Sequence, residues 1–230
     1  MNRKQRRIAD RAAAQEHVKA RRALALKVFH EVDELVDREI ARSVESGRRP
    51  SCAKGCSHCC REELYAPRAE AEAIVEWLDG AAPHVLEAMK PRIAAWLAWY
   101  RSEFPALVAR GIARRDAFYS HGPACPALVD DTCAIYPVRP MFCRTHHVTS
   151  PVDACRPEGD PARLDAPIQR MTTLLARAAP IGTKLRALVE AQGAEFQGTV
   201  HLLAEWLAHL LGVEQQPWRT AGVSGAGAAR

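Results

Sequence analysis

Eight cysteines are the residues of this 230-residue chain whose spacing points most directly to chemistry. Four of them follow the pattern Cys-x3-Cys-x2-Cys-Cys, and the other four are separated by seven, nine and eleven residues. All lie in two segments without helical periodicity, whereas buried structural cysteines pack on the apolar faces of elements. Thiols gathered in bendable loops favour metal ligation, because several thiolates must converge around the metal. The predicted ligands are Cys52, Cys56, Cys59, Cys60, Cys125, Cys133, Cys143 and Cys155.

Two kinds of metal centre suit this set of donors. Four thiolates complete the tetrahedral shell of a zinc ion, and four also hold an iron–sulfur cluster such as a 4Fe–4S cluster. Eight cysteines can form two such sites, or one site with thiols left over. The predicted cofactor is therefore zinc or iron, with the division of the cysteines among sites left open. Disulfides are not expected, because the cysteine content is too low for a disulfide scaffold.

Three stretches of the chain together resemble the bacterial YkgJ-type cysteine-cluster family, a family of zinc- or iron-chelating domains. They read Cys52-Ala-Lys-Gly-Cys56-Ser-His-Cys59-Cys60, then Cys125-Pro126-Ala-Leu128, then Cys133-Ala-Ile135-Tyr136-Pro-Val-Arg139-Pro140-Met-Phe-Cys143-Arg144. The similarity covers about half the chain. Many members have two residues between the first two cysteines, where this chain has three, and Cys155 lies outside the best-matched stretch.

This resemblance implies binding of zinc, iron or an iron–sulfur cluster. A flagellin lysine N-methylase has a similar cysteine pattern, so the resemblance also implies an alternative, a methyltransferase-like enzyme that uses the cluster. The spacing of the first three cysteines is also that of radical S-adenosylmethionine enzymes. Their motif follows the first strand of an α/β barrel, whereas a helical pattern precedes it here, and we therefore disfavour this assignment.

Charged side chains near the cysteines have two interpretations each. Arg139 and Arg144 bracket Cys143 and either neutralise the thiolates from outside the ligand shell or form ordinary loop ion pairs. Four histidines in the cysteine segments are expected to be loop residues or outer hydrogen-bond donors rather than ligands. A further group with helical spacing is expected to form a solvated face. The first group is His58, His121, His146 and His147, and the second is His201, Glu205 and His209.

The elements that must position these residues are mainly helices. A long helix is predicted from residue 2 to about residue 46, because apolar residues such as Val28, Val32 and Val36 recur at helical steps. Further helices are predicted over 67–78, 104–119, 165–178 and 203–211, with Pro83 and Pro91 dividing the stretch between the first two of these.

The predicted fold class is all-α, a helical body with two irregular cysteine-rich loops that converge on a metal site. A short hairpin near residues 128–135 is expected to turn at Asp130-Asp131. We expect an N-terminal helix with a basic arm over 1–47, the metal-binding region over 48–160 and C-terminal helices on the same core over 161–216. A flexible tail is expected over 217–230.

Composition places the chain among cytoplasmic proteins. It is 48% hydrophobic and 26% charged, with no apolar run long enough to span a membrane and no pattern of a secretory signal. Its formal charge of +5 is concentrated at the N-terminus, where residues 1–22 carry eight cations and two anions. The charges surround the expected helix and no aromatics interleave, which favours a solvated extension. The alternative is contact with nucleic acid, which would make the chain a zinc-stapled adaptor.

Overall fold

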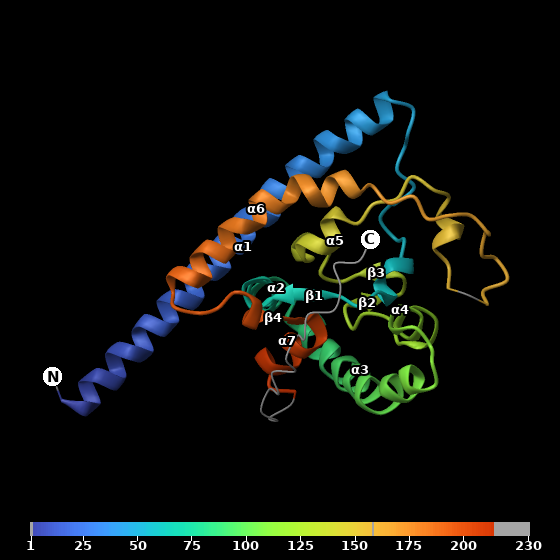
Figure 1. Cartoon of the computed structure of the whole chain (residues 1–230). Coiled ribbons are helices and arrows are strands. Elements are labelled where there is room, and N and C mark those ends of the chain that lie inside the picture. The colour runs from blue at the N-terminus through green and yellow to red at the C-terminus, as the bar shows by residue number, and fades with distance from the viewer. Residues whose placement is uncertain (1, 158, 214–230) are drawn as a thin grey trace.

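The computed structural model describes residues 2–157 and 159–213, and the predicted tail at 217–230 lies outside the described residues. The described chain is mostly helical, as predicted (Figure 1). Its α-helices are α1 (Arg3–Glu45), α2 (Arg68–Ala81), α3 (Pro83–Ala109), α4 (Arg114–Asp116), α5 (Met141–Thr145), α6 (Thr172–Ala191) and α7 (Leu203–Leu210). Short turns of 3-10 or π-helix are η1 (His58–Arg61), η2 (Ala117–His121), η3 (Tyr136–Val138), η4 (Val152–Cys155) and η5 (Gln197–Thr199).

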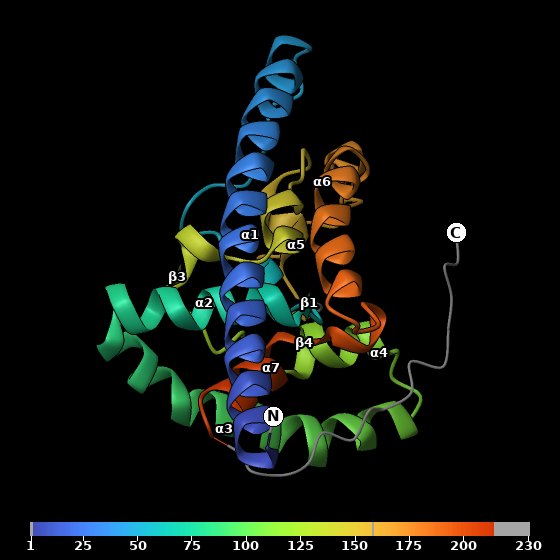
Figure 2. The same cartoon turned by 90° about the vertical axis from the view of Figure 1, so that its left-hand side faces the viewer.

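Helix α1 is the spine against which the other elements pack. It begins and ends within one residue of its predicted bounds, and the predicted stripe through Val28, Val32 and Val36 is buried. Figures 1 and 2 show α6 running antiparallel beside it, with α2 and α5 on the same side. Helix α1 thus contributes buried residues to the core, and it also packs against the elements that hold the second cysteine segment.

A buried ion pair joins α1, α2 and α6. The carboxylate of Glu72, 1% exposed, accepts hydrogen bonds from Nε and Nη2 of Arg21 at 2.9 and 2.8 Å and from Nε of Arg68 at 2.7 Å. The remaining nitrogen of Arg21, Nη1, donates to Gln192 at 2.8 Å, just beyond the end of α6. Because the charges of Arg21 and Glu72 are paired and hydrogen-bonded, the cost of their desolvation is compensated. These contacts fix the positions of the three helices relative to one another.

The predicted break at Pro91 is wrong, because α3 continues through both Pro91 and Pro105. A proline leaves the carbonyl four residues earlier without its helical donor. Pro91 and Glu87 both lie on the exposed side of α3, so this carbonyl can bond to water. The opposite side buries Met89 and Ile93 completely, which offsets the cost of the missing bond. The helix predicted over 104–119 is instead the end of α3 followed by α4 and η2.

Helix α6 begins at Thr172 rather than at residue 165 as predicted. Pro167 disfavours helical backbone at the residue before it. The chain ahead of the helix pairs instead with the end of the cysteine region. Thr149 N–H donates to the Gln169 carbonyl at 2.9 Å, and Met171 N–H donates to the His147 carbonyl at 2.8 Å. This pairing ties α6 to the segment that follows Cys143.

Two small antiparallel ribbons complete the fold. Strands β2 (Leu128–Val129) and β3 (Thr132–Cys133) form the predicted hairpin, with Asp130 and Asp131 at φ 46° and 55° as a tight two-residue turn requires. Strands β1 (Tyr65–Pro67) and β4 (Val200–Leu202) form an unpredicted pair that sets the first cysteine segment beside α7. Within the described residues, no helix has the length and apolarity that a membrane crossing requires.

Glu70 gives the fold a testable dependence on pH. Its carboxylate is fully buried and accepts the Met141 N–H at 3.1 Å, and burial raises its pKa to about 7. A raised folded-state pKa means that the folded chain holds this proton longer than the unfolded chain, so stability falls as pH rises from about 4.5 past 7. Glu70→Gln keeps an acceptor for Met141 without the charge.

We therefore expect Glu70→Gln to be stabilised relative to the unmodified protein at pH 8, by up to about 3 kcal/mol, and little changed at pH 4.5. Urea unfolding at both pH values measures the difference. Glu103→Gln, an exposed carboxyl on α3, is the matched control. An equal effect of Glu70→Gln at the two pH values would contradict this assignment.

Candidate metal centre

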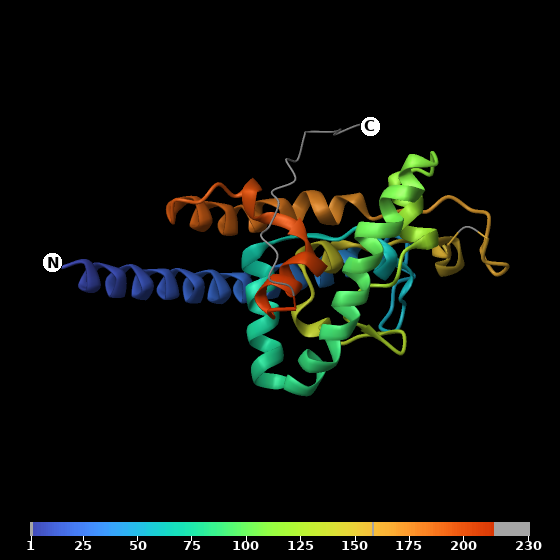
Figure 3. The same cartoon turned by 90° about the horizontal axis from the view of Figure 1, so that it is seen from below.

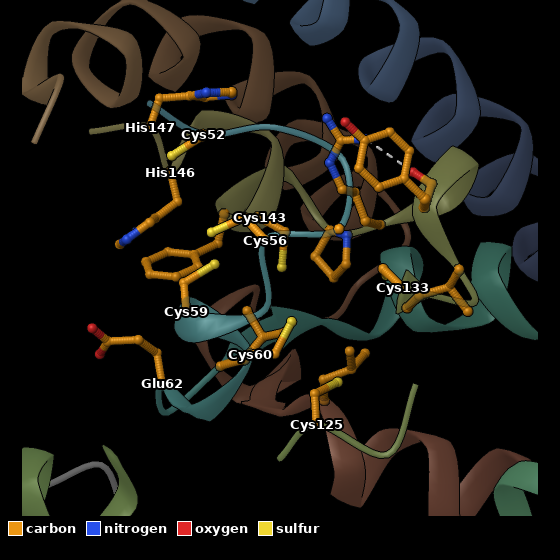
Figure 4. Close-up of a pocket in the computed structure, with 18 of the residues that line it drawn as sticks. Cys52, Cys56, Cys59, Cys60, Glu62, Cys125, Cys133, Cys143, His146 and His147 are labelled. Atoms are coloured by element: carbon orange, nitrogen blue, oxygen red, sulfur yellow. Dashed lines mark hydrogen bonds between the residues drawn. The ribbon is translucent and has the colours of Figure 1, made fainter. Parts of the chain in front are cut away.

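Seven of the eight cysteines line one cavity of about 130 Å³. Figure 4 shows Cys143 among the cysteines of the 52–60 loop, with Cys125 and Cys133 toward the other side of the view. The first four come from the loop after α1 and from η1, and the others come from the hairpin region, β3 and α5. The structure thus brings together thiols that are up to 91 residues apart, namely Cys52, Cys56, Cys59, Cys60, Cys125, Cys133 and Cys143.

Hydrogen bonds fix the two cysteine segments to each other. Cys125 N–H donates to the Cys60 carbonyl at 2.7 Å, which joins the segments directly at two cavity residues. Next to it, Arg61 Nη1 donates to the Gly122 carbonyl at 2.8 Å. These irregular loops are therefore held in place by hydrogen bonds to main-chain carbonyls, and not by membership of a long helix or strand.

The start of the first loop, at Ser51 and Cys52, is anchored to the segment after α5. Ser51 N–H donates to the Val148 carbonyl at 2.9 Å, and its hydroxyl donates to the Ser150 carbonyl at 2.6 Å. The Val148 N–H in turn points at Cys52 Sγ, 3.3 Å away. An N–H aimed at sulfur stabilises a thiolate, as the hydrogen bonds around metal-bound cysteines do.

The two arginines that bracket Cys143 have different roles. The Arg144 guanidinium is completely buried and is occupied by Asp33 and by the carbonyls of Pro137 and Arg139, the latter at 2.7 Å from Nε. Arg144 therefore anchors α5 to α1. Its contacts do not support the alternative role, in which it would neutralise the charge of the cysteine thiolates. Arg139 lines the cavity. Burial raises the pKa of the Cys133 thiol, and the Arg139 charge partly offsets that rise.

Burial disfavours the thiolate form of several cavity cysteines. It raises the pKa of Cys52 to about 11 and of Cys125 to about 12, and it raises that of Cys143 well above the usual range. A hydrogen bond with Cys60, followed by burial, raises the pKa of Cys59. A bound metal cation must displace these protons, so the cavity couples metal binding to proton release.

Cys59 lies close to the other cysteines. Burial is the main cause that raises the pKa of six other thiols, and proximity to Cys59 adds to the rise at each of them. Such mutual influence requires closeness within a poorly solvated space. The six are Cys52, Cys56, Cys125, Cys133, Cys143 and Cys155.

Cys155 stands apart from the other seven. It lies in η4, and it is not among the residues that line the cavity. Its carbonyl accepts the hydroxyl of Tyr119, while the charges at Cys56 and Cys59 contribute to its raised pKa after burial. Cys155 is therefore a neighbour of the thiol group rather than part of its wall.

Other polar residues lie at the cavity, and the predicted histidines divide into two groups. His146 and His147 line it, whereas His58 and His121 do not. Glu62, which follows the first cysteine group in sequence, also lines the cavity and accepts hydrogen bonds from Arg115 and Arg170 at 3.3 and 3.2 Å. From sequence, Glu62 is marked by its position two residues after Cys60, where it can bind a hard cation or flank a helix N-terminus. The predicted solvated group of His201, Glu205 and His209 lies on β4 and α7, outside the cavity lining.

The seven thiols surround a space and do not meet at one point. Within the described ranges, no three or more His, Cys, Asp or Glu side chains stand close enough to hold a metal ion. Thiol donors suit zinc and iron–sulfur centres, so the chemistry of the cavity wall fits these metals. Side-chain rotation in the loops would have to bring the thiolates to bonding distance.

Comparison with known proteins finds a family similar to this segment. Residues 51–160 match the family model CxxCxxCC, described as "putative zinc- or iron-chelating domain". The match includes all eight cysteines. No curated protein and no solved structure matches the chain significantly.

Gly122 permits the close contact that positions Cys125. A Cβ at this position would lie 2.5 Å from the Phe118 carbonyl oxygen and 3.0 Å from the Trp99 ring. We expect Gly122→Ala to lower the free energy of unfolding by about 1–3 kcal/mol, as overpacking does. Thermal melting measures this. Gly80→Ala in α2, where nothing lies within 4 Å, is the matched control and should not destabilise. A Gly122→Ala protein as stable as the unmodified one would show that the contact is not tight.

Proposed function

We propose that the chain binds a metal in the thiol-lined cavity, because residues 51–160 match the cysteine-cluster family of zinc- or iron-chelating domains. The observation that carries this proposal is the gathering of seven thiols, from two segments far apart in sequence, around one space. In this proposal residues 48–160 form the chelating region, and the helices of 1–47 and 161–216 frame it. The cavity cysteines are the ligands, and Cys155 is a supporting neighbour.

The number of donors and the size of the cavity favour more than one metal atom. A tetrahedral zinc ion takes four ligands, three fewer than the thiols that line the cavity. The cavity volume of about 130 Å³ is also far above the roughly 10–15 Å³ that a single water needs. An iron–sulfur cluster fits such a space and donor set, and when bound it supplies electron-transfer chemistry.

The residues of the chain have distinct tasks in this proposal. Cys59 lies among the other thiols and is the ligand whose loss should disturb the centre most. Arg139 offsets negative charge that accumulates as thiols ionise. The Val148 N–H supports the thiolate of Cys52 through its hydrogen bond. All eight cysteines are free thiols, which supports a reducing compartment such as the cytoplasm.

Metal analysis of the protein purified without oxygen tests the proposal. We expect two or more metal atoms per chain, with iron, sulfide and broad absorbance near about 400 nm if the centre is a cluster. Cys59→Ser should lose most of the metal, because it removes the central ligand. Cys155→Ser is the matched control and should retain it, since Cys155 does not line the cavity.

Three results would contradict the proposal in different ways. A folded protein without metal, in which every thiol reacts with a thiol reagent, would contradict metal chelation. One zinc ion per chain would contradict the multinuclear centre. Full metal content in Cys59→Ser, together with loss in Cys155→Ser, would place the centre elsewhere.

The mouth of the cavity favours a second candidate, an enzyme. Tyr136 and Phe142 line the cavity and remain 39% and 37% exposed, and Leu64, Ile135 and Leu203 form apolar wall. A metal centre beside such a wall has room for a ligand, which a closed structural site lacks. This supports the methyltransferase-like alternative.

Titration calorimetry with S-adenosylmethionine, on the metal-loaded protein, separates the two candidates. Saturable binding that weakens in Phe142→Ala supports the enzyme, because the methyl donor would occupy the cavity mouth. Leu175→Ala, an exposed apolar residue on α6 outside the cavity, is the control and should bind as the unmodified protein does. Absence of binding would contradict a methyl-transfer role and leave chelation unaffected.

A further inference from the structure

The first four turns of α1 extend beyond the rest of the molecule. Figures 1 and 3 show this end of the helix standing clear of the body, and every residue from 2 to 17 is exposed. The accompanying helix reaches only to the base of this extension, where Gln192 donates to the His17 carbonyl at 3.2 Å. A capping box between Asn2 and Gln5 closes the free end. We call residues 3–17 the arm.

The arm continues the face of α1 that packs on the core, with cations in place of apolar residues. Steps of seven residues keep nearly the same side of a helix. Counting back from buried Val32 gives buried Ala25, then Val18, Arg11 and Lys4. Each step drifts by about 20°, so Arg11 and Lys4 lie about 60° and 80° around the helix from Val32, and the core stripe gives way to a basic stripe that includes Arg3 and Arg7.

Within the body, arginines on this side of α1 bind carboxylates. Arg21 is paired with Glu72 and Arg22 with Glu76, both from α2. The five cations of the arm form no ion pair with any described residue. They repel one another at helical spacing, and Asp10, three and four residues after Arg7 and Arg6, offsets only part of this repulsion, so an external anion would stabilise the arm further. These cations are Arg3, Lys4, Arg6, Arg7 and Arg11.

We infer that the arm binds double-stranded DNA, lying along the major groove and contacting the phosphates on its walls. The groove is about 12 Å wide and admits an α-helix of about 10–12 Å diameter. Four of the five cations are arginines, whose planar guanidinium binds phosphate through two hydrogen bonds. Alanines at positions 9 and 12–14 keep the helix slim between them.

The apolar content of the arm argues against other partners. Ile8 is the one large apolar residue among the basic side chains, and no aromatic residue is present. Protein interfaces bury aromatic or large apolar anchors, and helices that lie in a membrane surface need Trp, Phe or Leu on one face. Contacts to phosphate need neither, and they carry no sequence preference.

Fluorescence anisotropy of a labelled 20-base-pair duplex, titrated with the full chain, tests this inference. Five phosphate contacts predict a slope of about −4.5 for log affinity against log salt, so affinity should fall several hundred-fold between 50 and 200 mM salt. Replacing Arg3, Lys4, Arg7 and Arg11 with alanine should make this slope shallower by about 3.6 and weaken binding at 50 mM salt by more than tenfold. Alanine preserves the helix, which circular dichroism verifies.

The matched control removes the same four charges from exposed positions elsewhere, through alanine at Lys27, Arg48, Arg49 and Arg110, and should retain the affinity and most of the slope. No duplex binding at 50 mM salt, or equal binding by the two variants, would overturn the inference. Tighter binding to anionic phospholipid vesicles or to single-stranded RNA than to the duplex would overturn it as well.

Discussion

The completely buried guanidinium of Arg144 is the interaction on which the shape of the thiol cavity depends. It is bound to Asp33 on α1 and to two carbonyls of the chain that leads into α5, and it lies over the Phe29 ring at 4.5 Å. A buried charge whose three nitrogens are all hydrogen-bonded holds its surroundings in one arrangement, since removing a partner of a buried ion pair costs about 3–5 kcal/mol. The segment with Cys143 therefore has a fixed place on the long helix.

The rest of the cavity is built from chain with little regular structure. The bond between Cys125 and Cys60 joins its two halves, and the pairing of 147–150 with 169–171 closes it toward α6. Burial raises the pKa of most of these thiols, so metal binding is linked to loss of protons. The same helix that supports this cavity extends into the basic arm, so the proposed DNA-binding surface and the proposed metal centre share one helix.

Sequence was informative where periodicity or a single chemical type dominates. The long helix, the hairpin at Asp130-Asp131 and the gathering of cysteines in loops all followed from local patterns. The continuation of α3 through Pro91 did not, because it depends on which side of the helix faces water. The anchoring role of Arg144 and the place of Glu62 were also beyond reach, since both arise from contacts between segments far apart in sequence. The partition of the thiols, with Cys155 outside the cavity, is likewise a property of the tertiary fold.

X-ray absorption spectroscopy of the metal in the purified protein tests the central claim most directly. A centre held by the cavity cysteines predicts a first shell of sulfur, at about 2.3 Å for zinc, with further metal atoms beyond it if the centre is multinuclear. A first shell dominated by nitrogen and oxygen would contradict the account, because the cavity wall offers mainly thiols. Such a result would move the metal to carboxylates and histidines elsewhere on the molecule.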